Sequence, residues 1–126
     1  MAGERVLLID DNPLNLDLAQ FVLEADGFVV DRALDCLEAW QRLRAQRPDI
    51  ALVDIQLPDT DGLSLVRTIK AEPALAGIPL IAFTAYAMQG DEARFLAAGC
   101  DGYIAKPIDV HSFAARVRRY LAGGGA

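Results

Sequence analysis

The sequence predicts a single doubly wound α/β domain, in which helices cover both faces of a parallel β-sheet. Five short apolar runs, each typical of a buried strand, recur along the 126 residues. Helical patterns separate these runs, which favours right-handed crossovers between parallel strands. A chain of 126 residues also has the size of one domain with one hydrophobic core.

Composition and charge narrow the class of protein. Hydrophobic residues make up 53% of the chain and charged residues 24%, as in an ordinary globular domain, and no apolar run has the roughly 20 residues needed to cross a bilayer. The first five residues lead straight into a strand-like run, without the pattern of a signal peptide, so we expect a cytoplasmic protein. The net charge of -6 argues against general binding of nucleic acid.

The first half of the chain begins with an apolar strand, Arg5 to Asp10, which is broken by Asn12-Pro13 at a helix start. The helix that follows ends at Gly27 as a C-terminal cap, and its periodicity places five apolar residues on one face: Leu14, Leu18, Phe21, Val22 and Ala25. Phe28-Val-Val30 is a short strand.

Asp35 is expected to cap a second helix, which ends before Pro48 and turns four side chains inward: Cys36, Ala39, Trp40 and Leu43. The next strand runs from Asp49 to Asp54. Residues 57–62 are dense in turn formers and precede a helix with Leu63, Val66 and Ile69 at core spacing.

The remaining elements follow the same alternation. Residues 80–84 form a fourth strand, 91–98 a short helix stopped by Gly99, and 102–106 a fifth strand. Pro107 separates that strand from an amphipathic helix that carries Phe113, Val117, Tyr120 and Leu121. The domain is therefore predicted to span residues 1–122, with a flexible Gly-rich tail at 123–126.

Asp54 is the residue that most needs an explanation, because it ends an apolar strand and a buried charge without a partner costs several kcal/mol. In doubly wound sheets, ligands bind beyond the carboxyl ends of the strands. The other polar residues at predicted strand ends are Asp10, Asp11, Thr84 and Lys106. All of them should meet at one edge of the sheet.

The chemistry of this group of side chains is that of a phosphoryl site. Carboxylates gathered at about 4 to 6 Å repel one another unless a cation lies between them. Oxygen ligands from Asp10, Asp11 and Asp54 suit Mg²⁺. Lys106 adds a positive charge and Thr84 a hydroxyl for the phosphoryl group, and Asp54, on the central strand, is the carboxylate that we expect to be phosphorylated.

With these residues in this order, the sequence resembles the receiver domain of two-component response regulators over essentially its whole length. The matching motifs are Asp10-Asp11, Asp54 with Pro58 and Gly62, Thr84-Ala85 and Lys106-Pro107. The resemblance implies a five-stranded sheet with the flavodoxin-like order 2-1-3-4-5 and five helices. Details such as the run from Phe83 to Met88 most resemble receivers of hybrid histidine kinases and single-domain regulators of the DivK type.

The resemblance also implies partners and roles. A histidine kinase or a histidine phosphotransfer protein would phosphorylate Asp54, with Mg²⁺ held by Asp11, Asp54, the backbone carbonyl of Gln56 and, through water, Asp10. Thr84 and Tyr103 would form the switch, and the Lys106-Pro107 bond would be cis. A downstream signalling protein would bind the surface of the fourth helix, fifth strand and fifth helix.

Two positions near the acceptor are expected to give this chain its own timing. We hypothesise that Tyr86 shields the acyl phosphate and that Gln56 only partly orients the attacking water, which predicts slow hydrolysis. Neither Cys36 nor Cys100 is expected to form a disulfide or zinc site, because no Cys-x-x-Cys spacing is present. His111, the only histidine, is expected to face solvent at the start of the last helix.

Two other classes of function remain as alternatives. Aspartate-based phosphatases of the haloacid dehalogenase kind also form a phosphoaspartate, but Asp54-Ile-Gln56 lacks their second acid, and the chain has no cap domain. A flavin or nucleotide binder of the same fold needs a Gly-rich or hydroxyl-rich loop where this chain has Asp10-Asp11-Asn12. We therefore expect a receiver that catalyses only its own phosphorylation and dephosphorylation, and no enzyme acting on a separate substrate.

Overall fold

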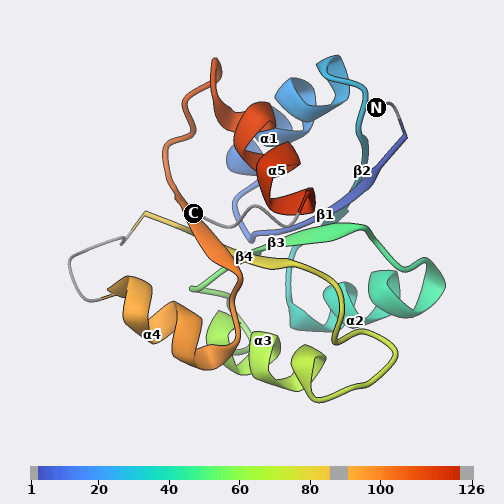
Figure 1. Cartoon of the computed structure of the whole chain (residues 1–126), viewed down its shortest axis with the longest axis vertical. Coiled ribbons are helices and arrows are strands. Elements are labelled where there is room, and N and C mark those ends of the chain that lie inside the picture. The colour runs from blue at the N-terminus through green and yellow to red at the C-terminus, as the bar shows by residue number, and fades with distance from the viewer. Residues whose placement is uncertain (1–2, 86–90, 123–126) are drawn as a thin grey trace.

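A computed structural model describes residues 3–85 and 91–122, and within them the chain forms a five-stranded parallel sheet between two layers of helices (Figure 1). The strands pair in the order β2-β1-β3-β4-β5. This confirms the predicted doubly wound sheet and its order 2-1-3-4-5. The strands are β1 (Arg5–Ile9), β2 (Val29–Ala33), β3 (Ile50–Asp54), β4 (Leu80–Thr84) and β5 (Gly102–Ala105).

The helices lie where the sequence predicts them, and they divide between the two faces of the sheet. They are α1 (Pro13–Ala25), α2 (Cys36–Ala45), α3 (Gly62–Lys70), α4 (Asp91–Ala98) and α5 (Phe113–Leu121). Figure 1 shows α1 and α5 on one face and α2, α3 and α4 on the other. Two buried apolar clusters fill the space between the sheet and these two layers.

The helix ends follow from local chemistry. The side chain of Asn12 accepts hydrogen bonds at the start of α1, where Pro13 lies in the first turn, and Asp35 caps α2 by accepting from the N–H of Glu38. Gly27 follows α1 with a φ of 93°, a backbone conformation that favours glycine. The caps at Asn12 and Asp35 fix where the chain leaves the carboxyl ends of β1 and β2.

The apolar face predicted for α1 is mostly not the face that packs on the sheet. Leu14 is 76% exposed and Phe21 73% exposed, and of the five residues Val22 is the one that packs against a buried cluster. A second apolar stripe, made of Leu16, Ala19 and Leu23, is buried instead. An apolar face is ordinarily the buried one, and α1 has two.

The second strand is also longer than the sequence indicates, and it starts one residue later. It runs from Val29 to Ala33 and includes Asp31 and Arg32. It is the edge strand beside β1, and edge strands tolerate charged side chains because one side of the ladder faces solvent. Because Asp31 and Arg32 interrupt the apolar run, the sequence pattern does not show that the strand continues to Ala33.

Several smaller expectations can be compared with the structure. Both cysteines are free thiols. His111 is exposed, as expected. The tail at 123–126 lies outside the described residues. None of the helices in residues 3–85 and 91–122 is long and apolar enough to span a bilayer.

Candidate functional site

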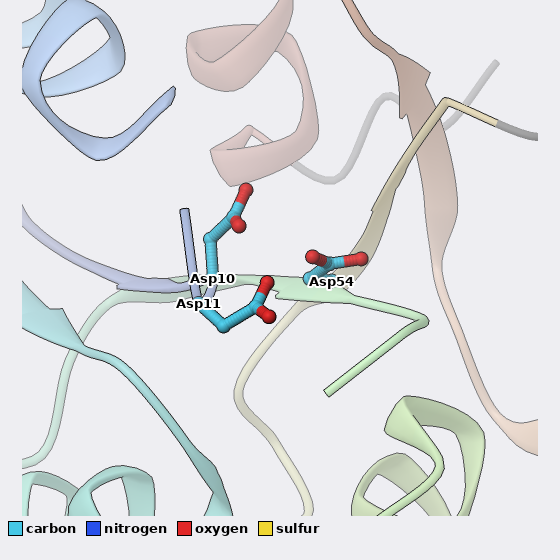
Figure 2. Close-up of side chains that lie close together, drawn as sticks. All are labelled: Asp10, Asp11 and Asp54. Atoms are coloured by element: carbon cyan, nitrogen blue, oxygen red, sulfur yellow. The ribbon is translucent and has the colours of Figure 1, made fainter. Parts of the chain in front are cut away.

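The parallel strands deliver the acidic residues to one edge of the sheet. Ile9 of β1 lies beside Val53 of β3, so Asp10 and Asp54 follow at the same level on neighbouring strands. Both side chains are buried, Asp10 fully and Asp54 to 6% exposure, while Asp11 is exposed at the rim. One carboxylate oxygen from each of the three lies within 4.8 Å of the others, and Figure 2 shows the three side chains at the ends of these two strands.

Lys106 lies between the two buried carboxylates. Its Nζ is 2.7 Å from Oδ2 of Asp10 and 3.2 Å from Oδ2 of Asp54. The backbone N–H of Lys106 donates to the carbonyl of Thr84 at 2.8 Å, which continues the pairing of β4 with β5 beyond the last strand residue. The lysine, predicted from a strand end, thus meets the acidic residues directly.

Each buried carboxylate has its two oxygens in different roles. Oδ1 of Asp10 accepts from the N–H of Asn12 at 2.9 Å, and Oδ1 of Asp54 accepts from the N–H of Gln56 at 2.9 Å. The Oδ2 atoms of both face Lys106. Asn15 adds an amide donor 3.4 Å from Oδ2 of Asp10. The backbone turns after β1 and β3 therefore orient the two carboxylates through their Oδ1 atoms, so that both Oδ2 atoms can bind the ammonium of Lys106.

The environment of Asp54 disfavours its charge. Burial is the largest cause that raises the pKa of the Asp54 carboxyl to about 6, and the charge of Asp10 acts in the same direction. The N–H of Gln56 and the ammonium of Lys106 oppose the rise in this pKa. An added cation near Asp54 would favour the ionised, nucleophilic form.

The donor set fits Mg²⁺. Asp10, Asp11 and Asp54 offer carboxylate oxygens, which hard divalent cations prefer, and Lys106 can neutralise only one of three negative charges. A cleft of about 390 Å³ opens above them. Its lining residues are Asp10, Asp11, Asn12, Asn15, Asp54, Gln56, Leu57, Pro58, Ala85 and Lys106.

The loop between β3 and α3 forms one wall of this cleft and is held at both ends. At its base, Gln56 pairs with Asp61, and the N–H of Gly62 donates to the carbonyl of Ile55. A Cβ on Gly62 would lie 2.1 Å from the carbonyl oxygen of Asp54, so only glycine fits there. At its tip, the carboxylate of Asp59 accepts from two N–H groups at the start of α2, at 3.0 and 3.3 Å.

The remaining predicted site residues lie around the same edge. Thr84 ends β4 and is 2% exposed, and Tyr103 is half-buried on β5, with its ring centroid 6.1 Å from that of Phe95. Gln56 is exposed at the cleft. The Lys106-Pro107 peptide bond is cis. Tyr86 lies outside the described residues.

Three residues at the site were not identified from the sequence: Asn15, Asp59 and Phe83. The spacing of Asn12 and Asn15 in the first helical turn could have indicated that both face the cleft. In the sequence Asp59 is one of several turn formers, and no local pattern indicates that it caps a helix 22 residues away. Phe83 reads in the sequence as one more apolar residue of a strand, and nothing there indicates that its ring lies 5.0 Å from Nζ of Lys106.

Comparison with known proteins agrees with this geometry. A family model described as the response regulator receiver domain matches residues 6–118. The chain belongs to the receiver domain family. Membership confirms the resemblance found in the sequence and identifies a two-component signalling domain rather than a classical enzyme such as the phosphatases considered above.

Individual receivers support the assignment. The polar-differentiation response regulator DivK of Brucella anthropi is 43% identical over 116 residues, which cover 92% of this chain and 94% of that protein. The receiver domain of the sensor histidine kinase PA1611 of Pseudomonas aeruginosa PAO1, solved with a magnesium ion in its active site cleft, superimposes with a TM-score of 0.86 at 36% identity and covers 96% of this chain and 99% of its own. A CheY-like receiver domain protein from Methanospirillum hungatei JF-1 gives a TM-score of 0.87 at 28% identity, with coverage of 98% and 97%.

Proposed function

We propose that Asp54 accepts a phosphoryl group from a phosphohistidine, carried by a histidine kinase or a histidine phosphotransfer protein. The observation that supports this most strongly is the ammonium of Lys106 bound at once by Asp10 and Asp54, with Asp11 at the same cleft. The site thus combines a nucleophilic carboxylate, a fixed cation and further oxygen ligands.

In the transfer step, Oδ2 or Oδ1 of Asp54 attacks phosphorus as the bond from phosphorus to the histidine nitrogen breaks. The electron pair of that bond stays on the imidazole, which leaves as the neutral ring when its other nitrogen carries a proton and otherwise takes up a proton from solvent. Mg²⁺, held by Asp11, Asp54, the carbonyl of Gln56 and, through water, Asp10, would offset the charge of the incoming phosphoryl oxygens. Lys106 stabilises the same oxygens from the protein side.

The surface beside the cleft supports docking of the phosphohistidine protein on α1. Leu14, Leu18 and Phe21 form an exposed apolar stripe along this helix, and its first turn contributes Asn12 and Asn15 to the cleft. A donor that reaches Asp54 passes over this end of α1. Exposed apolar side chains that continue from a reactive site are typical of an interface, and we assign this one to the phosphohistidine donor.

The response to phosphorylation would pass through Thr84 and Tyr103 to a downstream signalling protein at α4, β5 and α5. Tyr103 packs on Phe95 of α4, and its carbonyl accepts from Arg116 of α5 at 3.2 Å. Tyr103 therefore contacts both helices of that surface. As part of the proposal, signalling takes place in the cytoplasm, where ATP maintains the supply of phosphohistidine.

Hydrolysis of the phosphoryl group would depend on Gln56, whose exposed side chain lies at the cleft. We propose that it orients the attacking water only in part, and that Tyr86 shields the acyl phosphate. If Tyr86→Ala left the dephosphorylation rate of the purified protein unchanged, the shielding role would be rejected. Gln56→Ala tests the other residue in the same assay.

The acceptor role can be tested with acetyl phosphate and Mg²⁺. Intact mass spectrometry should detect one added phosphoryl group in the wild type and none in Asp54→Asn. Chelation of Mg²⁺ or the Asp11→Asn substitution should greatly reduce the yield. An unmodified wild-type mass under saturating acetyl phosphate would contradict the proposal.

A further inference from the structure

The ammonium of Lys106 has a third neighbour besides Asp10 and Asp54. Its Nζ lies 5.0 Å from the centroid of the Phe83 ring, over the face of that ring. The lysine side chain is only 12% exposed, so its charge is largely removed from water. A cation over an aromatic face is attracted by the negative charge of the ring's π-system, and the attraction strengthens when the cation is desolvated.

The position of Phe83 in the sheet places it next to both the acceptor Asp54 and the strand that leads to Lys106. On β4 it pairs with Asp54 of β3 on one side and with Ile104 of β5 on the other. The strand that carries Phe83 therefore lies between the one that ends in the acceptor and the one that leads to the lysine. The ring is 2% exposed and belongs to the apolar cluster under α1 and α5.

The ring itself is held in place. Phe113, the first residue of α5, stacks on Phe83 with ring centroids 6.0 Å apart and an interplanar angle of 28°. Phe113 is also buried. A ring fixed by packing can fix the direction of a flexible neighbour, and the four-carbon stem of lysine has many rotamers that would take the ammonium away from the cleft.

We propose that Phe83 is a positioning residue for phosphoryl transfer, whose aromatic face holds the Lys106 ammonium where it meets both Asp10 and Asp54. An aliphatic side chain of similar size would fill the same space and provide no attraction for the cation. The inference depends on the proposed function, since it assigns to Phe83 a share in the rate at which Asp54 is phosphorylated.

Stepwise fluorination of the ring separates this role from packing. Mono-, di- and trifluorophenylalanine at position 83 keep the shape of the ring nearly constant while they weaken its negative face. The rate of phosphorylation by acetyl phosphate at fixed Mg²⁺ should fall in order along the series. For the trifluoro ring we expect a rate about three- to tenfold lower, within the usual range of cation–π energies.

Phe28 provides a matched control. It is also buried, and the guanidinium carbon of Arg118 lies 4.2 Å from its ring centroid, but neither residue lines the cleft. The same fluorinated residues at position 28 should leave the phosphorylation rate unchanged. Equal rates along the Phe83 series, or an equal fall in both series, would overturn the positioning role, whereas a wild type that is not phosphorylated at all contradicts the proposed function of Asp54 instead.

A spectroscopic signature adds a readout that needs neither Mg²⁺ nor phosphate. The ring current of Phe83 should shift the ε-methylene protons of Lys106 upfield in the wild type. In Phe83→Leu these signals should return toward the values of an exposed lysine, and Phe83→Tyr should restore them. Lysine signals that are identical in wild type and Phe83→Leu would overturn the inference.

Discussion

Replacing Asp54 by asparagine in the Mg²⁺-free protein should stabilise the fold at neutral pH. The pKa of the Asp54 carboxyl is about 6 in the folded chain and 3.8 ordinarily. Each pH unit between these two values contributes about 1.36 kcal/mol, so the ionised carboxylate costs the folded state about 3 kcal/mol at pH 7. The amide can still accept from the N–H of Gln56 but loses part of the contact with Lys106, so we expect a net gain of about 1 to 3 kcal/mol.

The sign of the pH dependence follows from proton uptake. Between pH 3.8 and about 6 the unfolded chain has released the Asp54 proton while the folded chain keeps it, so raising the pH through this range destabilises the wild type relative to the variant. Below this window the cost disappears, and above it the cost is constant. The difference in free energy of unfolding between Asp54→Asn and wild type should therefore grow by about 2.4 kcal/mol from pH 4 to pH 7.

Urea unfolding in the presence of a chelator, repeated at half-unit steps of pH, measures this difference. Asp61→Asn is the matched control, because Asp61 is exposed and caps α3, and asparagine caps a helix about as well. Its difference from wild type should stay within about 0.5 kcal/mol across the same range. A difference for Asp54→Asn that does not change with pH would refute the electrostatic reasoning.

Three further predictions concern the surroundings of the site. Asp59→Ala should lower the free energy of unfolding by about 1 kcal/mol, because two N–H groups of α2 lose their acceptor, whereas Asp59→Asn should keep most of the wild-type stability. Equal stabilities of Asp59→Ala and wild type by urea unfolding would argue against the cap. Gly62→Ala should cost about 3 kcal/mol or more in the same assay, since its Cβ would collide with the carbonyl of Asp54, and wild-type stability would show that the loop can yield. Leu16→Ala should lower the free energy of unfolding by about 2 to 5 kcal/mol, whereas Phe21→Ser should change it by less than about 0.5 kcal/mol. Phe21→Ser should instead slow phosphorylation by a phosphohistidine protein and leave phosphorylation by acetyl phosphate unchanged. Equal slowing with both donors would contradict the docking role of α1.

The acidic cleft could be predicted from the sequence because parallel strands bring their carboxyl ends to one edge whatever their order. Asp10, Asp54 and Lys106 each end or follow an apolar run, and their meeting needs no knowledge of side-chain packing. The contacts of Asp59 and Phe83 could not be predicted in this way. Asp59 reaches α2 through the path of a loop, and the ring of Phe83 meets Lys106 through the choice of rotamer, neither of which leaves a periodic pattern.

The α1 helix shows how the same limit affects a whole face. At 3.6 residues per turn, the stripe of Leu14, Leu18 and Phe21 lies roughly 160° from the stripe of Leu16, Ala19 and Leu23, so periodicity supports two opposite faces equally well. Only the position of the helix on the sheet decides which stripe is buried. The stripe that remains exposed is the one with the larger side chains, Leu14, Leu18 and Phe21. Packing of this one domain accounts for a single apolar stripe. The second stripe begins beside Asp10 and Asp11, where the proposed donor of phosphoryl groups to Asp54 would approach, and this position is the reason why we propose the stripe as the docking surface of that donor.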